Sequence, residues 1–205
     1  MTKNEIVDYL TKDLKISVLN DVKPCLQLTS SNGGYFAVPR LTLSYVDYLG
    51  ALYNGYSGLT IKGRRVFATS SCAKAFLENV FGTIDPNYKI YGALLWEIYR
   101  NGTIHLYAPL TLENQGKTIE WSVHKGQRTE QILGPSKPIW ATHLVPIQYS
   151  RTGWLQPISI VCLYEDLLSA IDEYAKLISE NSTLEQKFKQ VADALQIPEH
   201  TSLKW

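Results

Sequence analysis

The chain has 205 residues, of which 45% are hydrophobic and 19% charged, so it can bury a sizeable core and has the composition of a globular protein. A formal net charge of +1 excludes a strong overall attraction to nucleic acids or to anionic membranes. The sequence contains neither the roughly 20 consecutive apolar residues that span a bilayer nor an N-terminal signal peptide. Its three widely separated cysteines indicate reduced thiols. We therefore expect one cytoplasmic domain over residues 1–205, with no membrane partner.

Two helices are predicted in the first quarter of the chain. Thr2 and Glu5 form a capping box. The helix that begins there should end before Pro24, because proline lacks the backbone N–H that a helix interior needs. Pro39 suits the first turn of a second helix, and Gly55 follows the last apolar residues of that helix. The segment between the two helices contains glycine and asparagine and is predicted as a loop or a short hairpin.

Two further helices complete the first half of the chain. Apolar residues at helical spacing predict a helix over residues 70–81, with Gly82 as its C-terminal cap. Asp85 and Pro86 give a clear start signal, an N-cap residue followed by proline at the first helical position. The helix that begins there has a regular apolar face and should end at Gly102.

The pattern changes from helical to alternating in the second half of the chain, which predicts strands. The predicted strands are residues 103–112, 117–125, 141–149 and 156–162. Helical signals then return, with Glu165 and Asp166 in a first turn and a second capping box at Ser182 and Glu185. The predicted fold is mainly α (α+β), a helical bundle of about five or six helices with an antiparallel β insert near residues 103–162.

One short segment, Arg100-Asn101-Gly102-Thr103-Ile104-His105, combines residue types that suit RNA cleavage. Arginine is permanently charged and its planar guanidinium matches phosphate oxygens, whereas histidine exchanges protons near neutral pH. Attack of a ribose 2′-hydroxyl needs both a proton shuttle and a cation on the phosphate in the transition state. Asn101 could orient the phosphate or the imidazole, and no metal is required.

This segment resembles the Arg-x4-6-His motif of the HEPN superfamily, in which a polar residue often follows the arginine. The stretch LLWEIYRNGTIHLYAP is also similar to short uncharacterised bacterial proteins with the pattern Arg-x-Gly-x-x-His-x-Tyr. The resemblance covers roughly residues 70–110. It implies an α-helical homodimer, in many cases a metal-independent ribonuclease of a toxin–antitoxin or phage-defence system, with RNA and an antitoxin-type protein as partners. In HEPN domains the histidine lies at or just inside a helix, whereas here residues 103–112 are predicted as a strand.

Each residue of the motif also has a structural interpretation. Arg100 could pair with Glu97 on the same helix or interact with the helix C-terminus. Glu78, on the preceding predicted helix, could hold Arg100 in place. A hairpin centred on residues 114 and 115 would place His105 directly opposite His124, so that the two histidines could share acid and base roles or bind a metal. A shift of one residue in the register would place His124 on the other face.

A small basic group precedes the third predicted helix. Lys62, Arg64 and Arg65 lie in the predicted loop that follows Gly55, where they could contact RNA phosphates. Three basic residues beside a helix start are also typical of a solvated loop. The solvated loop is the stronger of these two interpretations.

Three functions follow from these patterns. The first is a HEPN-like, metal-independent RNA endonuclease with Arg100, Asn101 and His105 as its catalytic residues. The second is a non-catalytic module that uses the same pocket to bind a nucleotide, RNA or a protein partner. The third is a structural homodimer without a ligand. The sequence contains no phosphate-binding glycine loop, dinucleotide fingerprint, nucleophile elbow or HExxH motif, and we expect neither cofactor nor metal.

Overall fold

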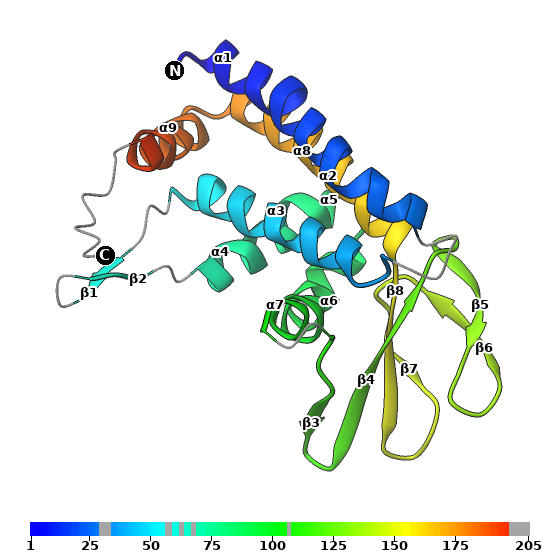
Figure 1. The fold of residues 1–205 in the computed structure, drawn as a ribbon. Coiled ribbons are helices and arrows are strands. Elements are labelled where there is room, and N and C mark those ends of the chain that lie inside the picture. Colours follow the sequence, from blue (N-terminus) through cyan, green and yellow to red (C-terminus); the bar gives the residue numbers. More distant parts are fainter. Residues whose placement is uncertain (29–33, 56–58, 62–63, 67–68, 106–107, 197–205) are drawn as a thin grey trace, which may run out of the picture.

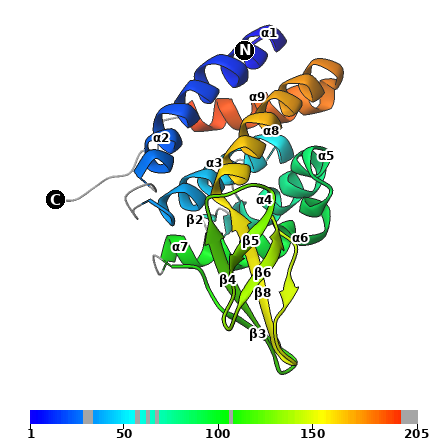
Figure 2. The ribbon, with the colours of Figure 1, turned by 90° about the vertical axis from the view of Figure 1, so that its right-hand side faces the viewer.

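The protein was analysed as a computed structural model that describes residues 1–28, 34–55, 59–61, 64–66, 69–105 and 108–196. Of residues 59–61, 64–66, 69, 104, 105, 114 and 196, only the backbone is described. Helices form a bundle at one end of the molecule, and the strands between residues 112 and 159 project from the other end (Figures 1 and 2). The predicted mainly α (α+β) fold class is confirmed.

The N-terminal helical segment is longer than predicted. It consists of α1 (Lys3–Asp8), a π-helical stretch η1 (Tyr9–Leu14) and α2 (Lys15–Leu28), and it begins with the predicted capping box at Thr2. The expected end before Pro24 is wrong, because Pro24 lies within α2. Pro24 is exposed, whereas Val18 and Val22 on the same helix are buried. Packing of this apolar face therefore compensates for the hydrogen bond that proline removes.

The next helices pack closely on one another. Helix α3 (Ala37–Asn54) crosses the centre of the bundle, and Gly55 ends it in the left-handed conformation. It is followed by the hairpin strands β1 (Leu59–Ile61) and β2 (Arg64–Val66), where a loop was predicted, and by α4 (Thr69–Phe76). A Cβ atom on Gly50 of α3 would lie only 2.7 Å from Cα of Ala73 on α4. A glycine at this position therefore allows the two helices to approach closely.

The helix predicted over residues 70–81 is present as α4 and the π-helical stretch η3 (Leu77–Phe81). Gly82 does not end it, because Gly82 has right-handed helical angles and begins the short helix α5 (Gly82–Ile84). The helix after Asp85 runs through α6 (Asn87–Leu95), the π-helical stretch η4 (Trp96–Asn101) and α7 (Gly102–His105). The predicted end at Gly102 is therefore wrong as well.

The last two helices begin at residues other than those predicted. Helix α8 (Ile160–Glu180) starts earlier than expected, with Ser159 as its N-cap and its hydroxyl accepting a hydrogen bond from the N–H of Cys162. Helix α9 (Ser182–Gln196) is capped by Asn181, whose Oδ1 accepts the N–H of Thr183 at 2.9 Å. Both caps use the short polar side chain just before the helix, as expected for an N-cap.

The strands form a mixed sheet, not a purely antiparallel one. The four-stranded sheet has the order β3-β4-β8-β7 and consists of β3 (Leu112–Asn114), β4 (Lys117–His124), β7 (Ile147–Gln148) and β8 (Gly153–Ser159). Its central strands β4 and β8 pair in parallel, because residues 125–152 supply the long crossover that parallel pairing needs. Within the crossover, β5 (Thr129–Leu133) and β6 (Pro138–Thr142) form a separate hairpin.

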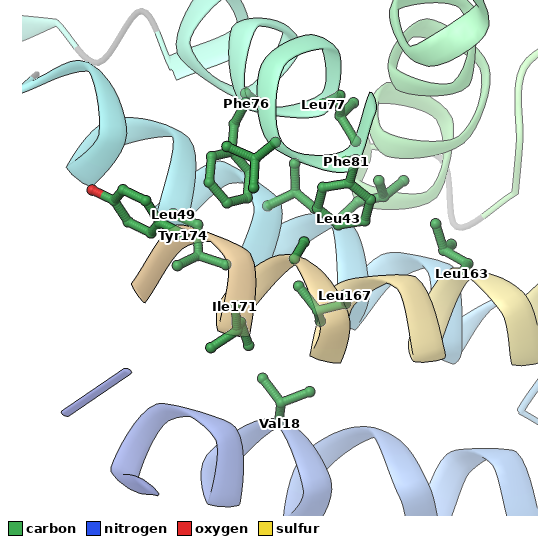
Figure 3. Close-up of a cluster of buried hydrophobic side chains, with 14 of the residues drawn as sticks. Val18, Leu43, Leu49, Phe76, Leu77, Phe81, Leu163, Leu167, Ile171 and Tyr174 are labelled. Atoms are coloured by element: carbon green, nitrogen blue, oxygen red, sulfur yellow. The ribbon is translucent and has the colours of Figure 1, made fainter. Parts of the chain in front are cut away.

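One continuous hydrophobic cluster joins the helices to the base of the sheet. Phe76, Phe81 and Tyr174 lie at its centre, where α3, α4, η3 and α8 meet (Figure 3). Ile158 of β8 and Leu144 belong to the same cluster. The strands are therefore anchored on the helical core at their base. No helix among the described residues is long and apolar enough to cross a bilayer.

Candidate functional site

The Arg-x4-His motif lies on helical backbone. Residues 103–105 belong to α7 and β3 begins only at Leu112, so the strand predicted over residues 103–112 is wrong. Arg100 and Asn101 end the π-helical stretch η4 directly before α7. Such stretches are rare and occur frequently at functional sites. The helix rises by about 1.5 Å per residue, so the backbones of Arg100 and His105 are separated by about 7.5 Å along the axis.

The side chain of Arg100 contacts two neighbouring groups. Its Nη2 donates to Oδ2 of Asp47 on α3 at 2.6 Å, and its guanidinium carbon lies 5.2 Å from the centre of the Trp96 ring. The exposed fractions are 19% for the Arg100 side chain and 16% for that of Asp47, so the pair is largely shielded from water. The carboxylate that binds Arg100 is therefore Asp47, and not Glu97 or Glu78 as the sequence suggested.

Glu97 joins Asn101 to a second helix. Its Oε2 accepts a hydrogen bond from the Asn101 amide at 2.8 Å, and its Oε1 forms an ion pair with Lys74 of α4. The predicted association of Glu97 with the motif is thus present, but through Asn101. We call Asp47, Lys74, Trp96, Glu97, Arg100 and Asn101 the Arg100 cluster.

The Arg100 cluster contains several polar atoms without partners. Among the described residues, nothing forms a hydrogen bond with Arg100 Nε, Asp47 Oδ1 or the indole N–H of Trp96, although all three atoms are buried. Buried polar groups without partners are uncommon in proteins and often mark a site for water, an ion or a ligand. The cluster therefore has hydrogen-bonding capacity that its own residues do not use.

The remaining predicted residues fall outside this cluster or outside the described residues. The backbone of His105 is described, but its side chain lies outside the described part of the chain, as do Lys62 and the side chains of Arg64 and Arg65. Glu78 lies in η3 and is exposed. The structure therefore brings together Arg100, Asn101 and Glu97, and it leaves the basic group untested.

The predicted pairing of His105 with His124 is wrong. His105 lies in a helix, and the hairpin pairs Leu112 with Ile119, which moves its centre to Gln115 and Gly116. Gln115 and Gly116 both have positive φ, as a tight two-residue hairpin turn requires. His124 instead pairs with Ser159 of β8, and its Nδ1 lies 2.6 Å from Oε1 of Glu130.

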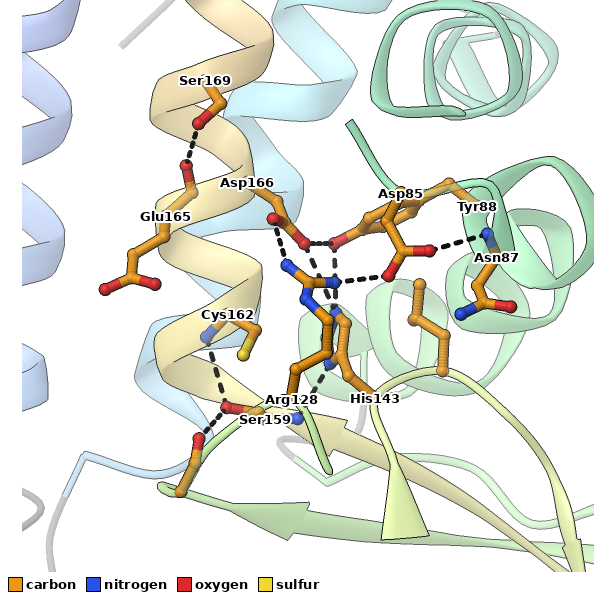
Figure 4. A network of polar contacts seen from close by, with 12 residues as sticks. Asp85, Asn87, Tyr88, Arg128, His143, Ser159, Cys162, Glu165, Asp166 and Ser169 are labelled. Carbon is orange, nitrogen blue, oxygen red and sulfur yellow. Dashed lines mark hydrogen bonds and ion pairs between the residues drawn. The ribbon is translucent and has the colours of Figure 1, made fainter. Parts of the chain in front are cut away.

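A second polar cluster joins the helices to the strands (Figure 4). Arg128 lies between Asp85 and Asp166, and its Nη2 donates to Oδ1 of Asp166 at 2.6 Å. The hydroxyl of Tyr88 donates to the other oxygen of Asp166 at 2.9 Å and lies 3.1 Å from Nε2 of His143. We call these five residues, Asp85, Tyr88, Arg128, His143 and Asp166, the Arg128 network.

Protonation in the Arg128 network follows from its burial. The Nδ1 of His143 accepts the backbone N–H of Ser159 at 3.0 Å, which places the ring proton on Nε2, facing Tyr88. Burial, together with the nearby charge of Arg128, lowers the pKa of His143 to about 3, so the ring is neutral at neutral pH. Burial also raises the pKa of Asp166, although Arg128 opposes this shift. The network is therefore a neutral histidine beside an ion-paired arginine.

The described residues contain no group of three or more histidine, cysteine or acidic side chains arranged to hold a metal ion. The Arg100 cluster contains a guanidinium and an ammonium, each of which is paired with a carboxylate, Arg100 with Asp47 and Lys74 with Glu97. What this arrangement can do chemically is to present a guanidinium, held on a helix, to a phosphate.

Sequence reasoning missed the pairing of Asp47 with Arg100, and it missed the Arg128 network. Asp47 lies among apolar residues of α3. A lone acidic residue on a buried helical face was the only signal in the sequence that could have indicated its role. Asp85 and Asp166 were recognised only as helix-start residues. Arg128 carried no signal, because its partners are distant in the sequence.

Comparison of the chain with protein-family models, with curated proteins and with solved structures gave no match in any of the three cases.

Proposed function

We propose that the chain is a metal-independent RNA endonuclease in which Arg100, Asn101 and His105 form the active site. The observation that carries this proposal is the continuous helix through η4 and α7, which includes both Arg100 and the backbone of His105. The HEPN resemblance calls for a histidine at or inside a helix. The predicted strand was the one feature of the sequence that disagreed with that resemblance.

The reaction would proceed by attack of a ribose 2′-oxygen on the adjacent phosphorus. His105 accepts the 2′-hydroxyl proton, the bond from phosphorus to the 2′-oxygen forms, and the bond to the 5′-oxygen of the next nucleotide breaks. The leaving oxygen takes up a proton, so the products are a 2′,3′-cyclic phosphate and a 5′-hydroxyl. Arg100 stabilises the additional negative charge on the phosphate in the transition state, and Asn101 orients the phosphate or the imidazole.

The partial exposure of the Arg100 side chain, 19%, supports this role, because part of the guanidinium can be reached from solvent. The described contact of Arg100 with Asp47 engages Nη2, whereas Nε has no partner among the described residues. Asp47 and Trp96 fix the direction of the guanidinium before substrate binds. A charged group that is already oriented stabilises a transition state without the cost of reorganisation.

Two further properties rest on the resemblance alone and belong to the same proposal. They are a homodimer that pairs two such sites, and a cytoplasmic toxin–antitoxin or phage-defence role with an antitoxin-type protein partner. The basic residues Lys62, Arg64 and Arg65 would contribute further RNA contacts.

The proposal is tested by incubating purified protein with mixed RNAs in excess EDTA and identifying the ends of the products. We expect wild type to leave 2′,3′-cyclic phosphates. Arg100→Ala and His105→Ala should each reduce the cleavage rate by about a hundredfold or more, as for loss of a charged stabiliser or a proton-transfer group. Arg100→Lys should recover only part of the rate, because lysine keeps the charge but not the planar geometry.

Arg151→Ala is the matched control, because Arg151 is an exposed arginine in the turn before β8. It should cleave RNA at the wild-type rate. Equal cleavage by wild type and by both active-site variants would mean that the activity belongs to a contaminant or another site. No cleavage by wild type would contradict the proposal and favour the non-catalytic binding module.

A further inference from the structure

A small groove lies along the contact between α3 and α7. It has a volume of about 320 Å³, and the described residues that line it are Phe36, Ala37, Arg40, Leu41 and Thr103. Phe36 directly precedes α3, three of these residues lie in the first turns of α3, and Thr103 lies on α7. The groove is therefore formed by α3 and by α7, and α7 directly continues the π-helical stretch η4 that carries Arg100.

The position of the groove relative to Arg100 follows from the contacts between these helices. Arg100 contacts Asp47, whereas Thr103, three residues later, faces the groove with Arg40 and Leu41. The two helical segments therefore run in opposite directions where they are in contact. Arg100 does not line the groove, but Thr103 does and lies about one helical turn after Arg100, in the direction in which the α7 backbone continues to His105.

The lining of the groove suits an aromatic ligand with an attached anion. Phe36 is partly exposed, and its ring is held by an edge-to-face contact with Trp121 of β4, with 5.3 Å between ring centres. Ala37 and Leu41 are apolar, and Arg40 adds a positive charge to the lining. Aromatic rings beside basic residues are the usual means by which proteins bind single-stranded nucleic acids, because every base has a flat face on which to stack.

We propose that this groove binds one unpaired base of single-stranded RNA next to the cleaved phosphate, with the base stacked on Phe36 and Arg40 beside the adjoining phosphate. This inference rests on the proposed endonuclease function and deepens it by naming the substrate as single-stranded RNA. A base within a duplex is paired and stacked on its neighbours, so it cannot enter the groove. The lining is mostly apolar, so it selects unpaired bases without a strong preference among them.

The test measures binding of a fluorescein-labelled 2′-O-methyl oligoribonucleotide by fluorescence anisotropy at one fixed salt concentration. This probe cannot be cleaved, because its 2′-oxygens carry no proton. We expect Phe36→Leu to weaken binding by about tenfold, as for loss of one base-stacking contact, and Phe36→Tyr to retain it. A duplex of the same sequence should bind equally to wild type and to Phe36→Leu.

Two further variants keep the test decisive. Ala37→Met fills the groove without removing Phe36, and should weaken binding even if Phe36→Leu folds poorly. Trp140→Leu changes an aromatic residue on β6 that is 70% exposed, and should leave binding unchanged. Unchanged binding in both Phe36→Leu and Ala37→Met, with circular dichroism as for wild type, would overturn the groove proposal.

The outcomes also separate this inference from the endonuclease proposal. If probe binding depends on Phe36 but wild type does not cleave RNA, the endonuclease proposal is contradicted and the groove proposal is supported. If cleavage depends on Arg100 but probe binding is unchanged in Phe36→Leu and Ala37→Met, the endonuclease proposal is supported and the groove proposal is overturned.

Discussion

Arg100 and Arg128 both connect separate elements of this fold, but their surroundings differ. Arg128 is bound by Asp85 and Asp166, which are only 8% and 4% exposed, and the other groups of its network are hydrogen-bonded to each other or to backbone. Arg100 is bound by Asp47 at one nitrogen, and polar atoms on both partners have no described partner. One arginine lies in a completed network and the other in an incomplete one.

This difference indicates different roles for the two arginines. A buried polar network in which every member is hydrogen-bonded fixes the elements that it joins, because breaking any contact leaves a polar group buried without a partner. In this molecule it fixes the strands on α6 and α8 (Figure 4). An incomplete cluster still has hydrogen bonds to offer a ligand. The comparison therefore supports a structural role for Arg128 and agrees with the ligand-binding role proposed for Arg100, and three measurements of stability test it.

The largest expected effect is that of Arg128→Met. The substitution leaves Asp85 and Asp166 buried without their cation, and breaking a buried ion pair in this way costs about 3 kcal/mol. Because the Arg128 side chain is 40% exposed, we expect a loss at this lower end of the usual range. Urea unfolding measures the change in the free energy of unfolding.

The control for this measurement is Arg151→Met, which removes an exposed arginine and should change stability by less than about 0.5 kcal/mol. The double variant Arg128→Met/Asp166→Asn should be more stable than Arg128→Met alone, because it removes one of the two buried charges that have lost their cation. Equal stability of Arg128→Met and wild type would show that the network does not hold the strands on the helices.

The second effect is a loss of stability in acid that originates at His143. Burial lowers the pKa of His143 to about 3, whereas an unfolded histidine has a pKa near 6.5, so below pH 6.5 the unfolded state binds more protons. Stability contributed by the neutral ring is therefore complete above about pH 6.5 and falls as the pH decreases toward 3. Between pH 7 and pH 5 we expect a loss of about 2 kcal/mol.

Unfolding in urea at several pH values between 7 and 5 checks this expectation in wild type and in His143→Gln. The variant should lose most of the pH dependence, whatever its stability at pH 7. His124, whose pKa burial also lowers, adds a smaller effect of the same sign. Asp166 acts in the opposite direction because its pKa is raised, and mainly at the acid end. The same pH dependence in wild type and in His143→Gln would contradict the assignment.

Local signals in the sequence predicted the helices better than the connections between them. The capping box at Thr2 and the apolar faces of α4 and α6 were sufficient, because these patterns depend on neighbouring residues. The parallel pairing of β4 with β8 was not predicted, because it joins residues separated by a long crossover. Pro24 and Gly102 were interpreted as helix ends, and tertiary packing overrode both.

The candidate site shows the same limit. The sequence placed Arg100, Asn101 and His105 together because they are adjacent in the chain. It did not identify Asp47 as the partner of Arg100, because that contact joins α3 to η4. The error at residues 103–112 arose because a short alternating apolar pattern fits both a strand and the last turn of a helix followed by a loop.

The smallest expected effect compares the two arginines directly. Arg100→Met should lower the free energy of unfolding by about 1 kcal/mol, roughly a third of the loss in Arg128→Met. It leaves one carboxylate without its cation, whereas Arg128→Met leaves two. That carboxylate, Asp47, is 16% exposed, more than either Asp85 at 8% or Asp166 at 4%, so it is hydrated more readily than they are. Methionine also retains packing on Trp96. Urea unfolding of both variants under one condition gives the ratio. A cost for Arg100→Met equal to that of Arg128→Met would mean that Arg100 is as structural as Arg128, and would remove the distinction on which its proposed role in binding phosphate depends.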